Sequence, residues 1–156
     1  MNRVERDEWL GCFLTEMEVS QLEGVFVSVA PDRTFRLLAL LTGWRNHVAR
    51  IESELDHLDS DTTVWGVYDL IAALALRSFI ARGVGILDSS SFEGFKRALD
   101  DVDSRFRGFT EGDDAGVVRR LDGGDRPSGE WWWDRLPRTG PIRREIERIK
   151  LQSSEP

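Results

Sequence analysis

Cysteine, histidine and lysine are scarce in this chain of 156 residues, and each scarcity narrows the possible chemistry. One cysteine and two histidines, His47 and His57, offer little for a metal centre or a nucleophilic mechanism. Cys12 lies between Leu10 and Phe13, so we expect a small buried side chain in a reducing compartment. The sequence therefore predicts no metal site and no cofactor.

The chain also lacks a long uncharged run. A membrane-spanning helix needs roughly 18 to 20 apolar residues, and the best candidate, residues 62–82, is interrupted by Asp69 and Arg77. Residues 3–8 are mostly charged, where a secretion signal would be apolar. We therefore expect a cytoplasmic protein with no membrane partner.

The chain has fewer positively charged than negatively charged side chains. The net charge is −7, and arginine outnumbers lysine by 19 to 2, which we interpret as the codon usage of a GC-rich bacterial genome. Residues 1–61 carry a balance of −6, whereas residues 131–156 carry +2. Phosphate binding needs a clustered basic face, so this charge argues against nucleic acid. It favours another protein as partner, for which a basic surface would be complementary.

Residues 62–82 form the most apolar stretch of the chain. A helix that is apolar all round must be buried all round, so this stretch predicts a central core helix. Asp69 and Arg77 are its exceptions, and their eight-residue spacing places them about 12 Å apart along the axis. Each would need a partner elsewhere, such as an ion-pair partner on a neighbouring helix, and a functional carboxylate at Asp69 is the alternative.

Apolar spacing predicts further helices over 4–17, 37–58, 92–109 and 141–150. The 37–58 helix would have Asp32 as its N-cap and carries an apolar seam with alternating spacings of four and three. The seam favours packing in an antiparallel bundle, and a homodimer is the alternative. It consists of Leu37, Leu41, Trp44, Val48, Ile51, Leu55 and Leu58.

The fold class we predict is all-α: a single domain over residues 1–156, with about five helices around the buried central one. Residues 25–29 would be an extended connection without a partner strand. Residues 110–130 would be a flexible acidic connector, since they lack the ligand pattern of a calcium loop, and residues 152–156 a frayed tail. The predicted core contains Leu41, Trp44, Val48, Ile51, Tyr68, Leu70, Ile71, Leu74, Leu99, Val102 and Phe106.

Three consecutive tryptophans open the segment 131–150. Consecutive side chains point in different directions on a helix or a strand, so Trp131, Trp132 and Trp133 cannot all face one core. We expect two to anchor the final helix and the third to lie exposed or in a groove, where Arg135 and Arg138 would supply a polar rim for a binding surface. Because core packing is the commoner use of aromatic residues, a purely structural clamp is favoured over this binding surface. A tryptophan-lined pocket for a small ligand is a further alternative.

Arg50 and His57 have six residues between them, which would place them on one helical face. This spacing resembles the Arg-x4-6-His spacing of HEPN ribonucleases, which are small all-helical proteins. The resemblance implies metal-independent RNA cleavage at a dimer interface, with His57 near the scissile phosphate and Arg50 stabilising its charge. The alternative is an ordinary surface pair between Arg50 and Glu54.

No phosphate-binding glycine loop, dinucleotide fingerprint or paired metal-ligand spacing occurs in the sequence. Size, acidity and the lack of catalytic groups favour a non-catalytic role in binding another protein. Immunity, antitoxin and regulatory proteins act in this way.

Overall fold

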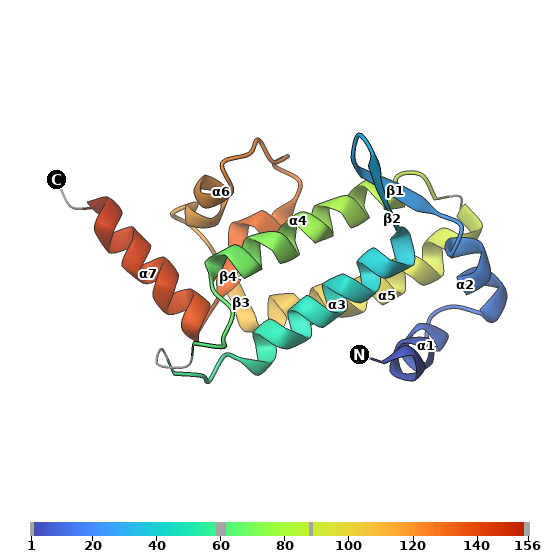
Figure 1. Cartoon of the computed structure of the whole chain (residues 1–156), viewed down its shortest axis with the longest axis horizontal. Helices are drawn as coiled ribbons and strands as arrows, with labels where there is room; N and C mark the ends of the chain where they lie inside the picture. Colours follow the sequence, from blue (N-terminus) through green and yellow to red (C-terminus); the bar gives the residue numbers. More distant parts are fainter. Residues whose placement is uncertain (1, 59–61, 88, 155–156) are drawn as a thin grey trace. The chain divides into compact units, whose positions relative to one another are not determined.

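The computed structural model describes residues 2–58, 62–87 and 89–154. These residues form seven α-helices, one 3-10 helix and two antiparallel sheets of two strands each (Figure 1). The predominantly helical character predicted from the sequence is confirmed. The two small sheets are additions that the helical periodicity did not indicate.

The chain divides into two compact units. Unit 1 comprises the residues up to 47 together with 76–104, and unit 2 comprises 48–75 together with the residues from 105 onward. The helices α3 (Leu37–Ser53), α4 (Val67–Val84) and α5 (Ser89–Phe109) each contribute residues to both units.

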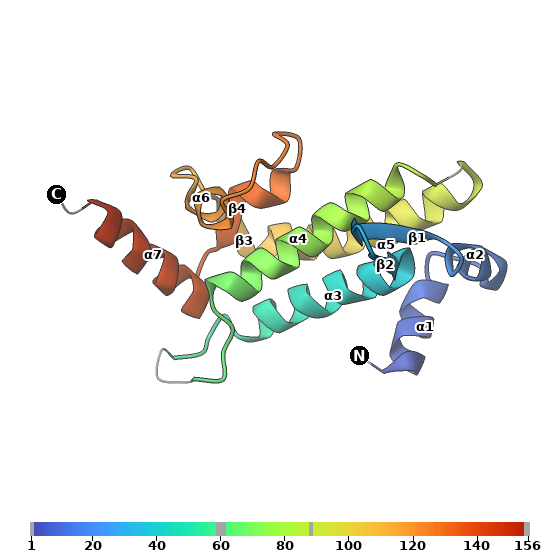
Figure 2. The same cartoon turned by 45° about the horizontal axis from the view of Figure 1, so that its top comes forward.

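Unit 1 begins with two short helices, α1 (Arg3–Gly11) and α2 (Glu16–Leu22), where the sequence predicts one (Figure 2). The chain restarts at Thr15, whose hydroxyl accepts from the Glu18 N–H at 3.1 Å while the Glu18 carboxylate accepts from the Thr15 N–H at 3.0 Å. This reciprocal capping box favours a new helix over continuation of the first. Cys12 lies in the turn and is exposed, so the prediction that it is buried is wrong.

The strands β1 (Phe26–Ala30) and β2 (Arg33–Arg36) form an antiparallel hairpin. The prediction of an unpaired extended connection over 25–29 is therefore wrong, because the polar stretch after it provides the partner strand. Asp32 lies in this hairpin instead of capping a helix, since α3 begins only at Leu37.

The hairpin packs closely against α4 within unit 1. A Cβ atom at Gly83 would lie 2.5 Å from a methyl group of Leu37 and 2.8 Å from one of Val27, and both side chains are buried. Glycine at position 83 thus permits an approach that any larger residue would disturb.

Five members of the predicted seam are buried: Leu37, Leu41, Trp44, Val48 and Ile51. Helix α3 ends at Ser53, so Leu55 and Leu58 lie beyond it, and Leu58 is 72% exposed. The part of the seam that is helical thus belongs to the core of the chain itself. A homodimer through Leu37–Leu58 would have to withdraw these side chains from that core.

Helix α4 is shorter and less enclosed than predicted. It begins at Val67 rather than Thr62, and Tyr68, expected in the core, is 69% exposed. Leu70 and Leu74 are buried as predicted. Asp69 is also exposed and accepts the Gly66 N–H at 2.9 Å, a bond typical of the first turn of a helix. The prediction of a helix buried on all sides is therefore wrong.

Arg77, the second charged residue of α4, is buried and pairs with Asp103 of α5. The indole Nε1 of Trp44, on α3, donates to the same carboxylate at 3.0 Å. The predicted partner on a neighbouring helix therefore exists for Arg77. The Asp69 carboxylate instead accepts a backbone N–H at the start of its own helix.

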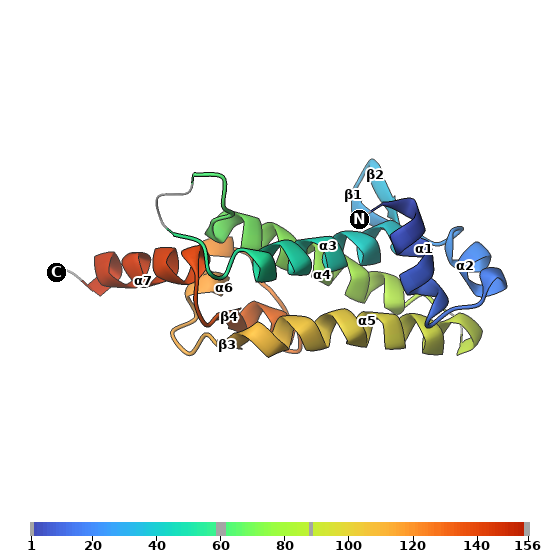
Figure 3. The same cartoon turned by 90° about the horizontal axis from the view of Figure 1, so that it is seen from below.

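Unit 2 has most of its regular structure after α5 (Figure 3). Strand β3 (Thr110–Gly112) pairs antiparallel with β4 (Arg135–Pro137), which directly follows the 3-10 helix η1 (Trp131–Asp134). Between them lies α6 (Val117–Asp122), in which Val117 and Val118 are buried. Residues 110–130 are thus more structured than the predicted flexible connector.

Acidic and basic side chains fix this region. The Asp113 carboxylate accepts the Val118 N–H at 2.8 Å and so caps α6. Arg119 donates to the Asp134 carboxylate at 2.6 Å and to the carbonyls of Arg126 and Glu130 at 3.0 and 3.2 Å. One guanidinium group therefore connects α6, the loop after it and η1.

The last helix, α7 (Pro141–Ser154), begins at the predicted proline and buries Ile142 and Ile146. It continues through residues 152–154, which the sequence predicts to be frayed; residues 155 and 156 lie outside the described part. Gly140 precedes it with a φ of +96°, and a Cβ atom there would lie 2.9 Å from the Leu55 backbone. Glycine alone suits this position.

Candidate functional site

The tryptophan segment forms the 3-10 helix η1 in unit 2. Trp132 and Trp133 are 4% and 0% exposed, whereas Trp131 is half-buried. The geometric expectation of two anchors and one indole at the surface thus agrees with the structure. Trp131 makes an edge contact with Trp132 at 5.7 Å between ring centroids and lies 6.2 Å from the ring of Phe106.

A positively charged side chain lies against the ring of Trp131. The guanidinium carbon of Arg107 lies 3.7 Å from the centroid of the indole ring, a close cation–π contact. Arg107 is exposed and stands in the last turn of α5. Sequence reasoning missed it as a site residue, because only the fold brings position 107 beside position 131.

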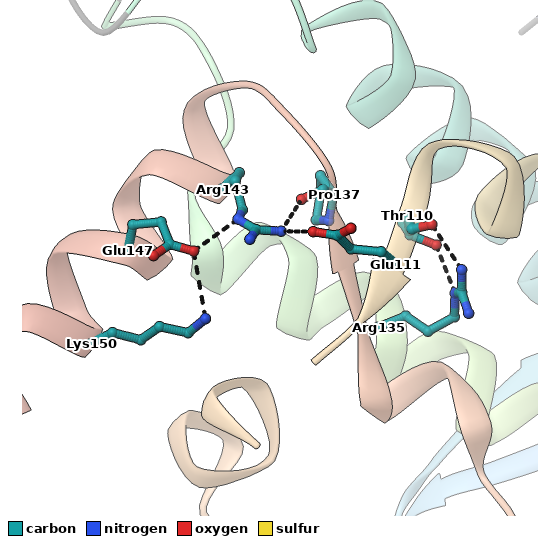
Figure 4. A network of polar contacts seen from close by, with 7 residues as sticks. All are labelled: Thr110, Glu111, Arg135, Pro137, Arg143, Glu147 and Lys150. Atoms are coloured by element: carbon teal, nitrogen blue, oxygen red, sulfur yellow. Dashed lines mark hydrogen bonds and ion pairs between the residues drawn. The ribbon is translucent and has the colours of Figure 1, made fainter. Parts of the chain in front are cut away.

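Arg135 and Arg138, the predicted rim residues, lie at the same end of α5. Arg135 donates from Nε to the Thr110 hydroxyl and from Nη2 to the Thr110 carbonyl, both at 2.8 Å (Figure 4). Arg138 donates from Nη1 to the Gly108 carbonyl at 2.5 Å. Both arginines thus satisfy carbonyl groups at and just beyond the helix end, which lack intrahelical partners.

We call Arg107, Arg135 and Arg138 the arginine cluster. Burial lowers the pKa of Arg135, and the positive charges of Arg107 and Arg138 lower it further, against the opposing effect of the Glu111 carboxylate. The cluster therefore gathers three positive charges in a chain whose net charge is −7.

The nearby Glu111 is engaged with another arginine. Its carboxylate forms an ion pair with Arg143 of α7, which also bonds to Glu147 at 2.9 Å (Figure 4). Although burial alone would lower the pKa of Arg143, its bonds to these two carboxylates raise it overall. Glu111 therefore serves mainly to connect β3 with α7.

The HEPN-like pair is not arranged as the spacing suggested. Arg50 lies in α3, but His57 follows the helix end at Ser53 and so does not share a helical face with it. Arg50 pairs with Glu54 at 3.0 Å, donates to the Thr63 carbonyl at 3.1 Å and stacks on Trp65. The ordinary Arg50–Glu54 pair, the alternative interpretation, is present.

Two hollows lined by described residues differ greatly in size. A groove of about 400 Å³ in unit 1 is lined by residues of α1, α2 and their flanks, none of which is a tryptophan. A hollow beside Trp65 in unit 2 has a volume of about 10 Å³, which is only enough for about one water molecule. Neither is the tryptophan-lined pocket considered from the sequence.

Within the described residues, no group of three or more His, Cys, Asp or Glu side chains is placed to hold a metal ion. None of the helices in the same part of the chain has both the length and the hydropathy needed to cross a membrane. No protein-family model, curated protein or solved structure matches this chain. The surface around Trp131 and the arginine cluster is therefore the candidate site, on its own geometry.

Proposed function

We propose that this protein acts in the cytoplasm by binding another protein, without catalysis, through the surface formed by Trp131 and the arginine cluster. The role would be that of a small immunity, antitoxin or regulatory protein. The observation that carries the proposal is the placement of Trp131, a half-buried indole that contacts Trp132 and Phe106 and has Arg107 stacked on its ring.

Tryptophan and arginine are the residue types most enriched at the energetic centres of protein interfaces. Trp131 offers a partly exposed indole at little entropic cost, because its neighbours already restrict its ring. Arg107, which contacts the indole, and Arg138, which belongs to the same cluster, are exposed and can form hydrogen bonds at the rim.

Affinity capture tests the proposal. The tagged protein is incubated with a lysate of the source organism, and proteins retained by wild type are compared with those retained by Trp131→Ala. Tyr68→Ala is the matched control, since Tyr68 is another exposed aromatic residue of unit 2. A partner retained by wild type and Tyr68→Ala but lost by a folded Trp131→Ala supports the proposal. Equal retention by all three would refute it.

A further inference from the structure

We infer that the segment bound beside Trp131 is acidic, and that the arginine cluster is a carboxylate-binding surface. This inference rests on the proposed binding function and adds the chemical class of the partner. It differs from the expectation based on net charge, because a partner meets the local charges of the surface that it contacts. Those charges are positive here.

Several guanidinium N–H groups of the cluster make no hydrogen bond within the described part of the chain. A guanidinium group has five N–H donors, and Arg138 uses one of them, on the Gly108 carbonyl. Arg135 uses Nε and Nη2 on backbone carbonyls and the Thr110 hydroxyl. Among the described residues, none of the cluster's hydrogen bonds or ion pairs ends on a carboxylate. The cluster can therefore bind one or two carboxylates by donating charge-assisted hydrogen bonds to them.

The charges around Arg135 also favour an acidic segment as the bound partner. Arg107 and Arg138 both destabilise the charged form of Arg135, and the Glu111 carboxylate does not compensate for them. An incoming carboxylate would relieve this repulsion, whereas a basic segment would increase it. Electrostatics therefore favours an acidic occupant for this surface.

Substitution of Arg107 can distinguish a binding role of the cluster from a purely structural role. Arg135 and Arg138 also cap carbonyl groups around the end of α5, so their loss would disturb the fold whether or not anything binds. The guanidinium of Arg107 contacts the ring of Trp131 and is otherwise exposed. A substitution at Arg107 thus removes charge from the surface without removing a cap.

A protein segment suits this site better than nucleic acid. Three arginines can neutralise only a few charges. In addition, two acidic residues are close to Trp131 in the chain: Glu130 directly precedes the short helix η1, and Asp134 is its last residue. A nucleic acid presents a continuous row of phosphates that would also meet these carboxylates. An acidic peptide can place its carboxylates where the cluster is and leave the remainder uncharged.

The test uses a fluorescein-labelled peptide of ten residues, two of them adjacent glutamates and the others uncharged, as the probe, and fluorescence anisotropy at low salt as the measurement. Wild type is compared with Arg107→Gln and with Arg33→Gln. Arg33 is a matched control, because it is exposed, stacks on an aromatic ring at 5.2 Å and carries the same charge, but belongs to unit 1. We expect affinity to fall about tenfold or more in Arg107→Gln, as for loss of a charge-assisted bond. Arg33→Gln should bind like wild type.

Arg107→Lys is a second variant, which keeps the charge and should retain more affinity than Arg107→Gln. Separately, the indole resonance of Trp131, assigned with Trp131→Phe, should shift on addition of the probe.

Equal losses in Arg107→Gln and Arg33→Gln would overturn the inference, since binding would then depend on net charge alone. Tighter binding of a ten-residue oligothymidylate with the same dependence on Arg107 would overturn it in favour of nucleic acid. If wild type does not bind the diglutamate peptide, the acidic partner is refuted, while capture through Trp131 still decides the proposed function.

Discussion

Arg77 and Asp103 form a two-bonded ion pair in the interior of unit 1. Nε and Nη2 of Arg77 donate to Oδ1 and Oδ2 of Asp103, both at 2.9 Å, and the two side chains are 8% and 4% exposed. Trp44 donates to the same carboxylate, so residues from α3, α4 and α5 converge on it. Burial of two charges is compensated only when both are present and well bonded.

The first prediction follows from this pair. Arg77→Met leaves the Asp103 carboxylate buried without its counter-charge, and we expect it to lower the free energy of unfolding by about 3–5 kcal/mol. Asp103→Asn should be costly in the same way. The double variant Arg77→Met/Asp103→Asn removes both charges, so its loss should be smaller than the sum of the single losses, as measured by urea denaturation. Additive losses would show that the two residues do not act as a pair.

The second prediction concerns the tryptophans. Trp133 is fully buried and Arg126 stacks on its ring at 4.3 Å, so Trp133→Ala should lower the free energy of unfolding by about 3–5 kcal/mol. Trp131→Ala removes a half-buried ring and its cation–π contact, for which we expect about 1–2 kcal/mol. Thermal unfolding of the two variants compares the losses. Equal losses would mean that Trp131 is also a core residue and would remove the basis for its role as a binding residue.

The third prediction compares two residues of α4 in unit 2. Leu74 is 0% exposed, and Leu74→Ala should lower the free energy of unfolding by about 2–5 kcal/mol. Tyr68→Ala, at a position 69% exposed, should change it by less than about 0.5 kcal/mol. Denaturant titration of both variants tests the assigned orientation of the helix. A larger effect at Tyr68 than at Leu74 would contradict that orientation.

The fourth prediction concerns pH. A hydrogen bond from Arg126 is the main reason why the pKa of Asp122 lies below its ordinary value. A lowered pKa in the folded state stabilises the protein above the unfolded-state pKa, and this stabilisation disappears as the pH falls below about 4. Asp122→Asn should therefore be less stable than wild type at pH 7, and the difference should shrink in acid. Asp125→Asn is the control at a neighbouring exposed carboxylate, for which we expect little difference at either pH.

The fifth prediction addresses the HEPN-like spacing. Arg50 is engaged with Glu54 and Trp65, and His57 lies beyond the helix, so we expect the purified protein to leave single-stranded RNA intact. Incubation with labelled RNA, followed by gel electrophoresis, measures this. Cleavage that disappears in both His57→Ala and Arg50→Ala would reverse the conclusion; cleavage that survives both substitutions would indicate a contaminating nuclease.

Apolar periodicity was sufficient to locate most of α3, α5 and α7, because each buries one face along its length. It failed between α1 and α2, where apolar residues continue at helical spacing through Phe13 and Leu14 although the chain turns there. The signal for the break was the capping-box spacing of Thr15 and Glu18, which periodicity does not detect. It also failed at β2, where all four residues are exposed and no apolar alternation marks a strand.

The candidate site was predictable only in part. Three adjacent indoles on one segment indicate that one must differ from the others, and Trp131 proved to be that residue. Arg107 could not be found in this way, since nothing in the sequence connects positions 107 and 131. The role of Asp103 was hidden for the same reason, because a single acidic residue on an amphipathic helix is usually solvated.

The pairing of β3 with β4 has a consequence for anyone who shortens this chain. Residues 110–130, rich in glycine and aspartate, would be the obvious spacer to delete or replace with a synthetic linker. Such a deletion would remove the partner strand of β4, both Thr110 acceptors of Arg135 and the Arg119 side chain that holds Asp134. A shortened version that keeps the tryptophans but omits this segment would therefore present them in a different arrangement.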